Sequence, residues 1–397
     1  MNKYRLKILF SFFLTLSLLY LLYYSKYLFE IVPPIVANGK IFLFGDWTAI
    51  ISAIKCDNLG INVFFENPCD PLKRVHVYGS VFLLFPTITK FKLFFFLILP
   101  LIFIIIFITT VLFLLKPSNL NSFILYFLSI FNPSTLLLLE RFNLDLIIFL
   151  GMIVLIFLNN KLIKFFSLVL MFTMKFWSVI LGSIFLFFKD YKFKENLFYA
   201  TFSLILFSTL IYFEYENLEL ISKSSNQITA SKYFIFSING FELITRDKIE
   251  LIYKYPTLCT YLILFISLIL CFSAEKNSLN ISYSKFDDKE YQLLILSSLI
   301  LTIMYFLFDN VYYREIFLIG CLPFFIKNQN FKYYKFLLFF IILRYLVFIL
   351  SRIMFKEYGF DWLYVIKNIF DLVLISNLLI IIIYFTRNYY KKLFQLV

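Results

Sequence analysis

The sequence predicts an all-α protein, a polytopic transmembrane helical bundle of about 11–12 spans, some of them short, with a large first outer loop that carries interfacial helices. Composition is the first reason, because the 397 residues are 62% hydrophobic and only 15% charged, with a mean hydropathy of +0.88. A soluble domain carries about 25% charged residues. Recurring apolar runs of roughly 20 residues, the length that crosses a bilayer core, are the second reason. We therefore interpret residues 1–397 as a single integral membrane domain.

The predicted spans follow the apolar runs from the N-terminus. A short basic head, Met1 to Lys7, precedes the first run, and no small-x-small cleavage pattern follows it, so we expect an uncleaved anchor. Several later runs are too short to cross the core alone at about 1.5 Å per residue, and such segments are tolerated where they line a protein-walled or watery cavity. The twelve predicted spans cover residues 6–24, 91–115, 120–139, 144–158, 162–175, 178–188, 197–213, 256–273, 291–308, 312–326, 336–353 and 363–385.

Charge gives the predicted orientation. Lys and Arg outnumber Asp and Glu in the segments on one side of these spans, which the positive-inside rule assigns to the cytoplasm together with both termini. To keep these cationic segments on the cytoplasmic side, the stretch 162–188 must be divided into two short spans with a break near Lys175. The first outer loop (about 25–90) and the second (about 214–255) then face the outer side, which we expect to be the periplasmic face of a bacterial inner (plasma) membrane. Because the net charge of +13 lies beside the spans, we expect membrane lipid and no nucleic acid as a partner.

The first outer loop is the longest hydrophilic interval in the first half of the chain. Short interfacial helices are predicted within it around Trp47–Lys55 and Val81–Thr89. It holds two of the five cysteines, Cys56 and Cys69, which form a disulfide in an oxidising compartment or remain two free thiols. The sequence has no C-x-x-C or His-rich set, so we expect no structural zinc and no cofactor, while a divalent metal requirement stays open. The second outer loop either dips into the membrane or packs over the site.

Unusual polar residues gather on the predicted outer face. Ionisable groups within spans cost about 2.5–3.5 kcal/mol to insert and usually serve a site or a pathway. The candidates are Asp46, Arg74, His76 and Tyr78 in the first loop, Glu140, Arg141, Asn143 and Asp145 between the third and fourth spans, Lys175 at the break, and Tyr313 and Arg314 between the ninth and tenth spans.

Each cluster of candidates also has a purely structural interpretation. Asp46 suits a helix cap, and Asn143 and Asp145 suit the exposed N–H groups that begin the fourth span. Lys175 could be a lysine whose side chain extends to the membrane interface. Arg314 could form a structural ion pair with Asp309 or Glu315, and His76 could be a surface residue. Convergence of these residues on one side favours the functional interpretation.

Five short motifs resemble GT-C-fold integral membrane glycosyltransferases, and are most similar to glycosyltransferase family 87, the polyprenyl-phosphate-mannose-dependent mannosyltransferase group. Each motif is short, and together they extend over roughly residues 40–330. One departure follows Arg74, where relatives typically read Arg-x-x-Asn-Tyr-Pro and this chain reads R-V-H-V-Y-G. The motifs are F-G-D-W (Phe44–Trp47), N-P-C-D-P-L-K-R (Asn67–Arg74), E-R-F-N-L-D (Glu140–Asp145), M-K-F-W (Met174–Trp177) and D-N-V-Y-Y-R-E-I-F-L (Asp309–Leu318).

The resemblance implies transfer of a mannose-like hexose on the outer membrane face, in the assembly of a cell-envelope glycan. A polyprenyl-phosphate sugar would be the donor, and a glycan or lipid-linked glycan the acceptor. Asp46 would be the general base, and Arg74, Lys175 and Arg314 would stabilise the departing lipid phosphate, with inversion at the anomeric centre. No Gly-rich nucleotide cradle occurs in the sequence, which is consistent with a lipid donor.

Two other classes of protein stay open at this stage. An O-antigen-type polymerase or ligase is also polytopic with a large outer loop, but that loop usually falls late in the chain. A lipid or ion transporter would favour ionisable residues at mid-membrane in several helices, and Arg344 is one candidate for such a residue.

Overall fold

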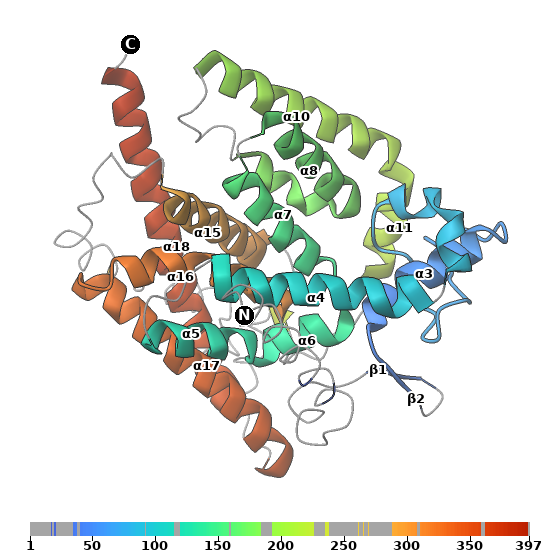
Figure 1. Ribbon diagram of the computed structural model, residues 1–397, viewed down its shortest axis with the longest axis horizontal. Helices are drawn as coiled ribbons and strands as arrows, with labels where there is room; N and C mark the ends of the chain where they lie inside the picture. The colour runs from blue at the N-terminus through green and yellow to red at the C-terminus, as the bar shows by residue number, and fades with distance from the viewer. Residues whose placement is uncertain are drawn as a thin grey trace, which may run out of the picture. The chain divides into compact units, whose positions relative to one another are not determined.

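The computed structural model describes most of the chain as helices (Figure 1). The described residues are 35–37, 40–91, 93–114, 120–158, 160–183, 193–225, 235–237, 288–307, 310–358 and 362–395, with the single positions Ser17, Tyr20, Tyr261, Phe265 and Ile269. The chain divides into two compact units, Met1–Leu115 with Leu136–Thr229, and Lys116–Thr135 with Ala230–Val397. The single membrane domain stays a prediction.

Four helices are long and apolar enough to cross a membrane, or up to six if each of two bent pairs is one span, within the residues described. The four cover Phe94–Leu112, Lys289–Leu307, Lys332–Met354 and Trp362–Arg387, in agreement with the predicted spans 91–115, 291–308, 336–353 and 363–385. These helices are consistent with an integral membrane protein. The predicted spans 6–24 and 256–273 lie outside the described residues except at the single positions named above.

The first unit begins with a short antiparallel ribbon, β1 (Ile35–Ala37) and β2 (Lys40–Phe42), followed by helix α3 (Gly45–Asp57). The ribbon was not predicted, although the intervening Asn38-Gly39 pair is a strong hairpin signal. Helix α3 confirms the helix predicted around Trp47–Lys55. It is buried on nearly all sides, and its Trp47 Nε1–H donates to the Phe95 carbonyl at 2.6 Å.

The helix predicted around Val81–Thr89 is instead two 3-10 helices, η1 (Ser80–Leu84) and η2 (Pro86–Lys90). Pro86 explains the correction, because a proline has no N–H to donate and disfavours helical backbone at the residue before it. Phe85 accordingly has φ −116° and ψ 62°.

The rest of the first unit is a set of helices of different lengths. Helix α4 (Leu99–Thr109) continues at both ends as π-helix, η3 (Phe94–Ile98) and η4 (Thr110–Leu114). Helices α7 and α8 confirm the short segments predicted at 144–158 and 162–175. The remaining elements are α6 (Pro133–Arg141), α7 (Asp145–Phe157), α8 (Lys161–Met174), η5 (Phe176–Ser183), α10 (Phe193–Phe213) and α11 (Tyr215–Ser225).

Three predicted spans are not continuous α-helices. The span 120–139 is α5 (Leu120–Ile130) followed by α6 with a 50° bend, because Pro133 starts α6 and the Asn132 side chain caps it by accepting from the Ser134 and Thr135 N–H groups. The span 178–188 is the 3-10 helix η5 as far as it is described. The span 312–326 is the 3-10 helix η8 (Tyr312–Phe317) followed by the short α16 (Leu318–Lys327).

The break predicted near Lys175 is confirmed. Helix α8 ends at Met174, and Lys175 has extended backbone with φ −146° and ψ 117° before η5 begins. The predicted 197–213 span is α10, and a 71° bend separates it from α11, which forms the start of the predicted second outer loop. Most of the rest of that loop, residues 226–234 and 238–255, lies outside the described residues.

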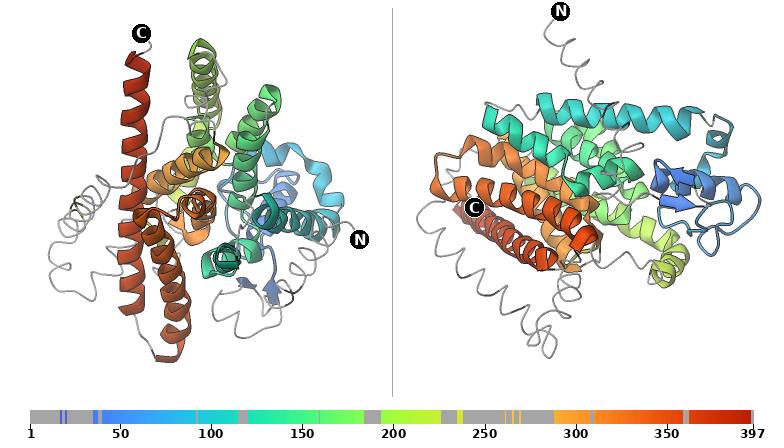
Figure 2. Two further views of the ribbon diagram at one scale, coloured as in Figure 1. Left: turned by 60° about the vertical axis from the view of Figure 1, so that its left-hand side comes forward. Right: turned by 90° about the horizontal axis from the view of Figure 1, so that it is seen from below.

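The second unit packs α15 (Lys289–Leu307), α16, α17 (Lys332–Tyr358) and α18 (Trp362–Gln395) around one apolar core. The paired helices α17 and α18 are visible in Figure 2. A second short antiparallel ribbon joins β3 (Ile235–Phe236) to β4 (Asn310–Val311), which the all-α prediction also omitted.

Candidate functional site

Asp46 lies in the first turn of α3 and faces two polar partners. Its Oδ2 accepts from the Asn143 Nδ2–H at 2.7 Å, and its Oδ1 is 3.4 Å from the Arg74 Nη1. The carboxylate is 12% exposed, so solvent reaches it. The alternative interpretation of Asp46 as the helix cap is wrong, because the N-cap residue is Phe44 and no side chain caps this end.

Arg74 is held mainly by another acid of the same loop, Asp70. The Arg74 Nε–H donates to Asp70 Oδ2 at 3.0 Å and an Nη2–H to Oδ1 at 2.9 Å, while Nη2 also donates to the Gly45 carbonyl at 2.7 Å. Burial alone would lower the pKa of Arg74, but Asp70 and then Asp46 more than offset that effect and raise it above its ordinary value. Arg74 therefore remains a cation, with 27% of its side chain exposed.

Lys175 lies at the break after α8 and reaches the start of α7. Its Nζ donates to Asn143 Oδ1 at 2.8 Å and to Asp145 Oδ1 at 2.7 Å. The ammonium is also 5.5 Å from the centroid of the Tyr78 ring. With 11% of the side chain exposed and an ion pair to a buried carboxylate, Lys175 is not an interface lysine that extends to solvent.

Asn143 has two roles, because its Oδ1 also accepts from the Asp145 N–H at 3.1 Å at the start of α7. Asn143 therefore satisfies one of the exposed N–H groups at the start of α7, as its structural interpretation expected, although the N-cap residue is Leu144, whereas the Asp145 carboxylate pairs with Lys175. These contacts join six residues from separate segments of the first unit, which we call the carboxylate–cation chain. Three carboxylates and two cations give it a formal charge of −1. Its members are Asp70, Arg74, Asp46, Asn143, Lys175 and Asp145.

His76 does not belong to the carboxylate–cation chain, and it is not a surface residue. It is buried between the rings of Phe64 and Phe82, and its Nε2 is 3.3 Å from the Gly79 carbonyl. Burial lowers the pKa of His76 to about 4 despite the Gly79 carbonyl and Glu214, so the ring is neutral at pH 7. Tyr78 packs edge-on against His76 and lies nearer the site, beside Lys175.

Glu140 and Arg141 lie at the C-terminal end of α6, just before Asn143. The Glu140 carboxylate is buried, with the Arg141 Nε 3.9 Å from its Oε2. The Glu140 carbonyl accepts from the Phe44 N–H at 2.7 Å, and Phe44 has the left-handed φ of 59°. Glu140 thus fixes the chain reversal that begins α3 and places Asp46.

Tyr313 and Arg314 lie on η8 of the second unit. The Arg314 Nη1 is 2.7 Å from the Met304 Sδ, and Tyr313 is buried. Glu315 pairs with Arg344 and Lys367, so the suggested pair of Arg314 with Glu315 is not formed, and Asp309 lies outside the described residues.

The second unit also contains a buried tetrad of charges, Glu315, Arg344, Lys367 and Asp371. Arg344 Nε donates to Asp371 Oδ1 at 2.5 Å, and Arg344 Nη2 contacts Glu315 Oε1. Lys367 Nζ pairs with Asp371 Oδ2 at 2.5 Å and with Glu315 Oε1 at 3.2 Å. Two cations and two carboxylates make the tetrad neutral.

From the sequence, Arg344 was named as a candidate mid-membrane charge, and Glu315 only as a possible partner of Arg314. The i, i+4 spacing of Lys367 and Asp371 indicates a pair on one helix, but it does not indicate the partners of that pair on other helices. Asp70 was also missed, since it was treated as part of a motif and not as a site residue.

No group of three or more His, Cys, Asp or Glu residues in the described part of the chain is arranged to hold a metal ion. No protein-family model, curated protein or solved structure matches the chain.

Proposed function

We propose that this protein is a membrane glycosyltransferase, which moves a mannose-like hexose from a polyprenyl-phosphate sugar to a glycan or lipid-linked acceptor. The observation that supports this proposal is the carboxylate–cation chain. In this cluster Asp46 lies between the Arg74 guanidinium and the Asn143 amide, which also contacts Lys175. The rest of the polypeptide is strongly apolar. We place the site on the outer face of a bacterial inner membrane, as the charge distribution predicts.

Asp46 is the general base of the proposed reaction. Its partly exposed carboxylate takes the proton from an acceptor hydroxyl as that oxygen attacks the anomeric carbon. The bond from the anomeric carbon to the lipid phosphate breaks on the opposite face, and its electron pair goes to the phosphate oxygen. The anomeric centre is inverted by this single displacement.

Arg74 and Lys175 stabilise the departing phosphate. Negative charge grows on the phosphate oxygen as the bond breaks, and fixed cations lower the free energy of that transition state. Arg74 is the better placed of the two in the described geometry, because its Nη1 makes only the 3.4 Å contact to Asp46. Tyr78 is assigned to the sugar-binding part of the site because its ring lies beside Lys175.

A transfer assay with purified protein and radiolabelled polyprenyl-phosphate mannose, glucose or arabinose tests the proposal. Asp46→Asn keeps the shape of the side chain and removes the proton acceptor, so we expect transfer to fall about 10²–10⁴-fold. Binding of the donor should change little. Asp57→Asn is the matched control, since it makes the same change at the other end of α3, where the side chain has no partner among the described residues. Near-normal transfer by Asp46→Asn would remove the central residue of the proposal.

A transporter is the second candidate, and the buried tetrad favours it. Arg344, Lys367 and Asp371 lie within two helices that are long and apolar enough to span a membrane, where ionisable residues usually serve a pathway. Proton flux into proteoliposomes that Glu315→Gln abolishes, with no sugar transfer by the wild type, would favour this candidate over the enzyme.

A further inference from the structure

Asp70 is a buried carboxylate that the proposed reaction does not use. Its Oδ2 accepts from the N–H groups of Leu72 and Arg74 at 3.1 and 3.0 Å, and from the Arg74 Nε–H at 3.0 Å. Its Oδ1 accepts from Arg74 Nη2 at 2.9 Å. One side chain therefore shapes the turn and also holds the guanidinium through two of its nitrogens.

These hydrogen bonds from Arg74 to Asp70 determine where the rest of the guanidinium lies. Because the group is planar and rigid, fixing Nε and Nη2 also fixes Nη1, which is directed at Asp46. The 3.4 Å separation is longer than the roughly 2.7–2.9 Å of a close charge-assisted hydrogen bond. Asp70 thus keeps Arg74 near Asp46 while preventing a tight pair that would occupy the Asp46 oxygen.

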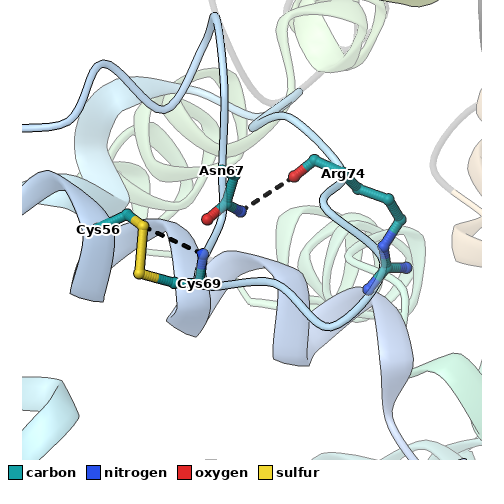
Figure 3. The surroundings of a disulfide bond; sticks show 4 residues. All are labelled: Cys56, Asn67, Cys69 and Arg74. Atoms are coloured by element: carbon teal, nitrogen blue, oxygen red, sulfur yellow. Dashed lines mark hydrogen bonds between the residues drawn. A yellow bond between two sulfur atoms is a disulfide. The ribbon is translucent and has the colours of Figure 1, made fainter. Parts of the chain in front are cut away.

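The disulfide between Cys56 and Cys69 holds the segment that carries Asp70 (Figure 3). Cys56 lies in the last turn of α3, whose first turn contains Asp46, and Cys69 immediately precedes Asp70. From the disulfide the chain runs back along α3 to Arg74, and Asn67 Nδ2 donates to the Arg74 carbonyl at 3.0 Å. The bridge therefore sets the position of Asp70 along the helix that contains Asp46.

We propose that Asp70 is a positioning residue for Arg74 and Asp46, and that the Cys56–Cys69 disulfide holds Asp70 in place for this role. The catalytic part of the inference rests on the proposed sugar transfer. Without Asp70, or without the bridge, the guanidinium keeps only its contact with the Gly45 carbonyl, turns about it and closes on Asp46, where it competes with the acceptor hydroxyl for the carboxylate.

A kinetic double-mutant cycle tests whether Asp70 acts through Arg74. Asp70→Asn should slow transfer about 10–100-fold, the scale of a misplaced catalytic group, and should move the acid limb of the pH–rate profile to lower pH. In an Arg74→Ala background, Asp70→Asn should cause no further loss. Additive losses, with an unmoved pH profile, would overturn the proposal.

Chemical modification of Arg74 provides a measurement that does not depend on activity. A dicarbonyl reagent modifies accessible guanidinium groups, and peptide mass spectrometry gives the rate at position 74. We expect modification to be about tenfold faster in Asp70→Asn and in the Cys56→Ser/Cys69→Ser double variant, because the charge-assisted hydrogen bonds that hold the guanidinium are lost. Asp57→Asn is the matched control and should leave the rate at its wild-type value.

The two measurements separate the two proposals. Faster modification in the Asp70 and cysteine variants, with no transfer by the wild type, would support the positioning role and overturn the proposed function. Wild-type transfer with an unchanged modification rate in these variants would overturn the positioning role alone.

Discussion

Removing Arg344 from the buried tetrad should destabilise the protein strongly. Arg344, like Lys367, pairs with both carboxylates, with Asp371 at 2.5 Å and with Glu315, and its side chain is fully buried. Arg344→Met leaves two buried carboxylates with one ammonium, so the cluster changes from neutral to −1. Breaking a buried ion pair on one side costs about 3–5 kcal/mol, and we expect a loss of that size in the free energy of unfolding.

The neutral double substitution provides the sharper comparison. Arg344→Met combined with Asp371→Leu removes one cation and one carboxylate, and leaves the Lys367–Glu315 pair in place at 3.2 Å. Because replacing both members of a buried pair by apolar residues is often neutral, the double variant should be more stable than either single variant.

Thermal unfolding of purified protein in detergent measures these differences. Lys335→Met, which removes an exposed cation from the same helix, is the control and should change the stability by no more than about 0.5 kcal/mol. A loss below about 1 kcal/mol for Arg344→Met, or additive losses in the double variant, would refute the electrostatic argument.

Three further predictions follow from the first outer loop. Replacing Cys56 and Cys69 with serine should lower the stability by about 3 kcal/mol, the chain-entropy value for a loop of this length; two free thiols in non-reduced peptides of the wild type would contradict the bridge. A lone cysteine at position 69, which is partly exposed whereas Cys56 is buried, should react with an impermeant thiol reagent added outside in a background without the other cysteines, and labelling only from the cytoplasmic side would reverse the topology. Burial lowers the pKa of His76 from its usual 6.5 to about 4 in the folded protein. The contribution of His76 to the free energy of unfolding, roughly 3 kcal/mol, is therefore fully present above pH 6.5 and is lost as the pH falls from there through 4. His76→Gln should remove that part of the pH dependence of unfolding, and since His76 is the single histidine, an unchanged acid dependence would exclude it as the source.

The sequence was sufficient to predict most of the candidate site, because polar groups in an apolar chain have few possible partners. Asp46, Arg74, Asn143, Asp145 and Lys175 were selected as isolated polar residues, and the structure joins them by hydrogen bonds and ion pairs. A buried polar group costs free energy unless it is paired, which is why such residues converge.

The remaining features depend on information that hydropathy does not contain. The tetrad could not be predicted, since the apolar runs around Lys367 and Asp371 do not reveal which face of α18 meets α17. The bend before α6 depends on the Asn132 cap and Pro133, and hydropathy averages over both. The burial of His76 depends on how the first outer loop folds Phe64 and Phe82 around its ring, which a hydropathy pattern does not show.

The tetrad also affects how the second unit enters a membrane during synthesis. Glu315 leaves the ribosome first, Arg344 follows on α17, and Lys367 and Asp371 arrive together on α18. An arginine at the centre of a span costs about 2.5–3.5 kcal/mol to insert by itself, whereas α18 brings the carboxylate that Arg344 binds at 2.5 Å. The two helices are therefore expected to leave the translocon as a pair, and α17 to wait at its exit until α18 has been made.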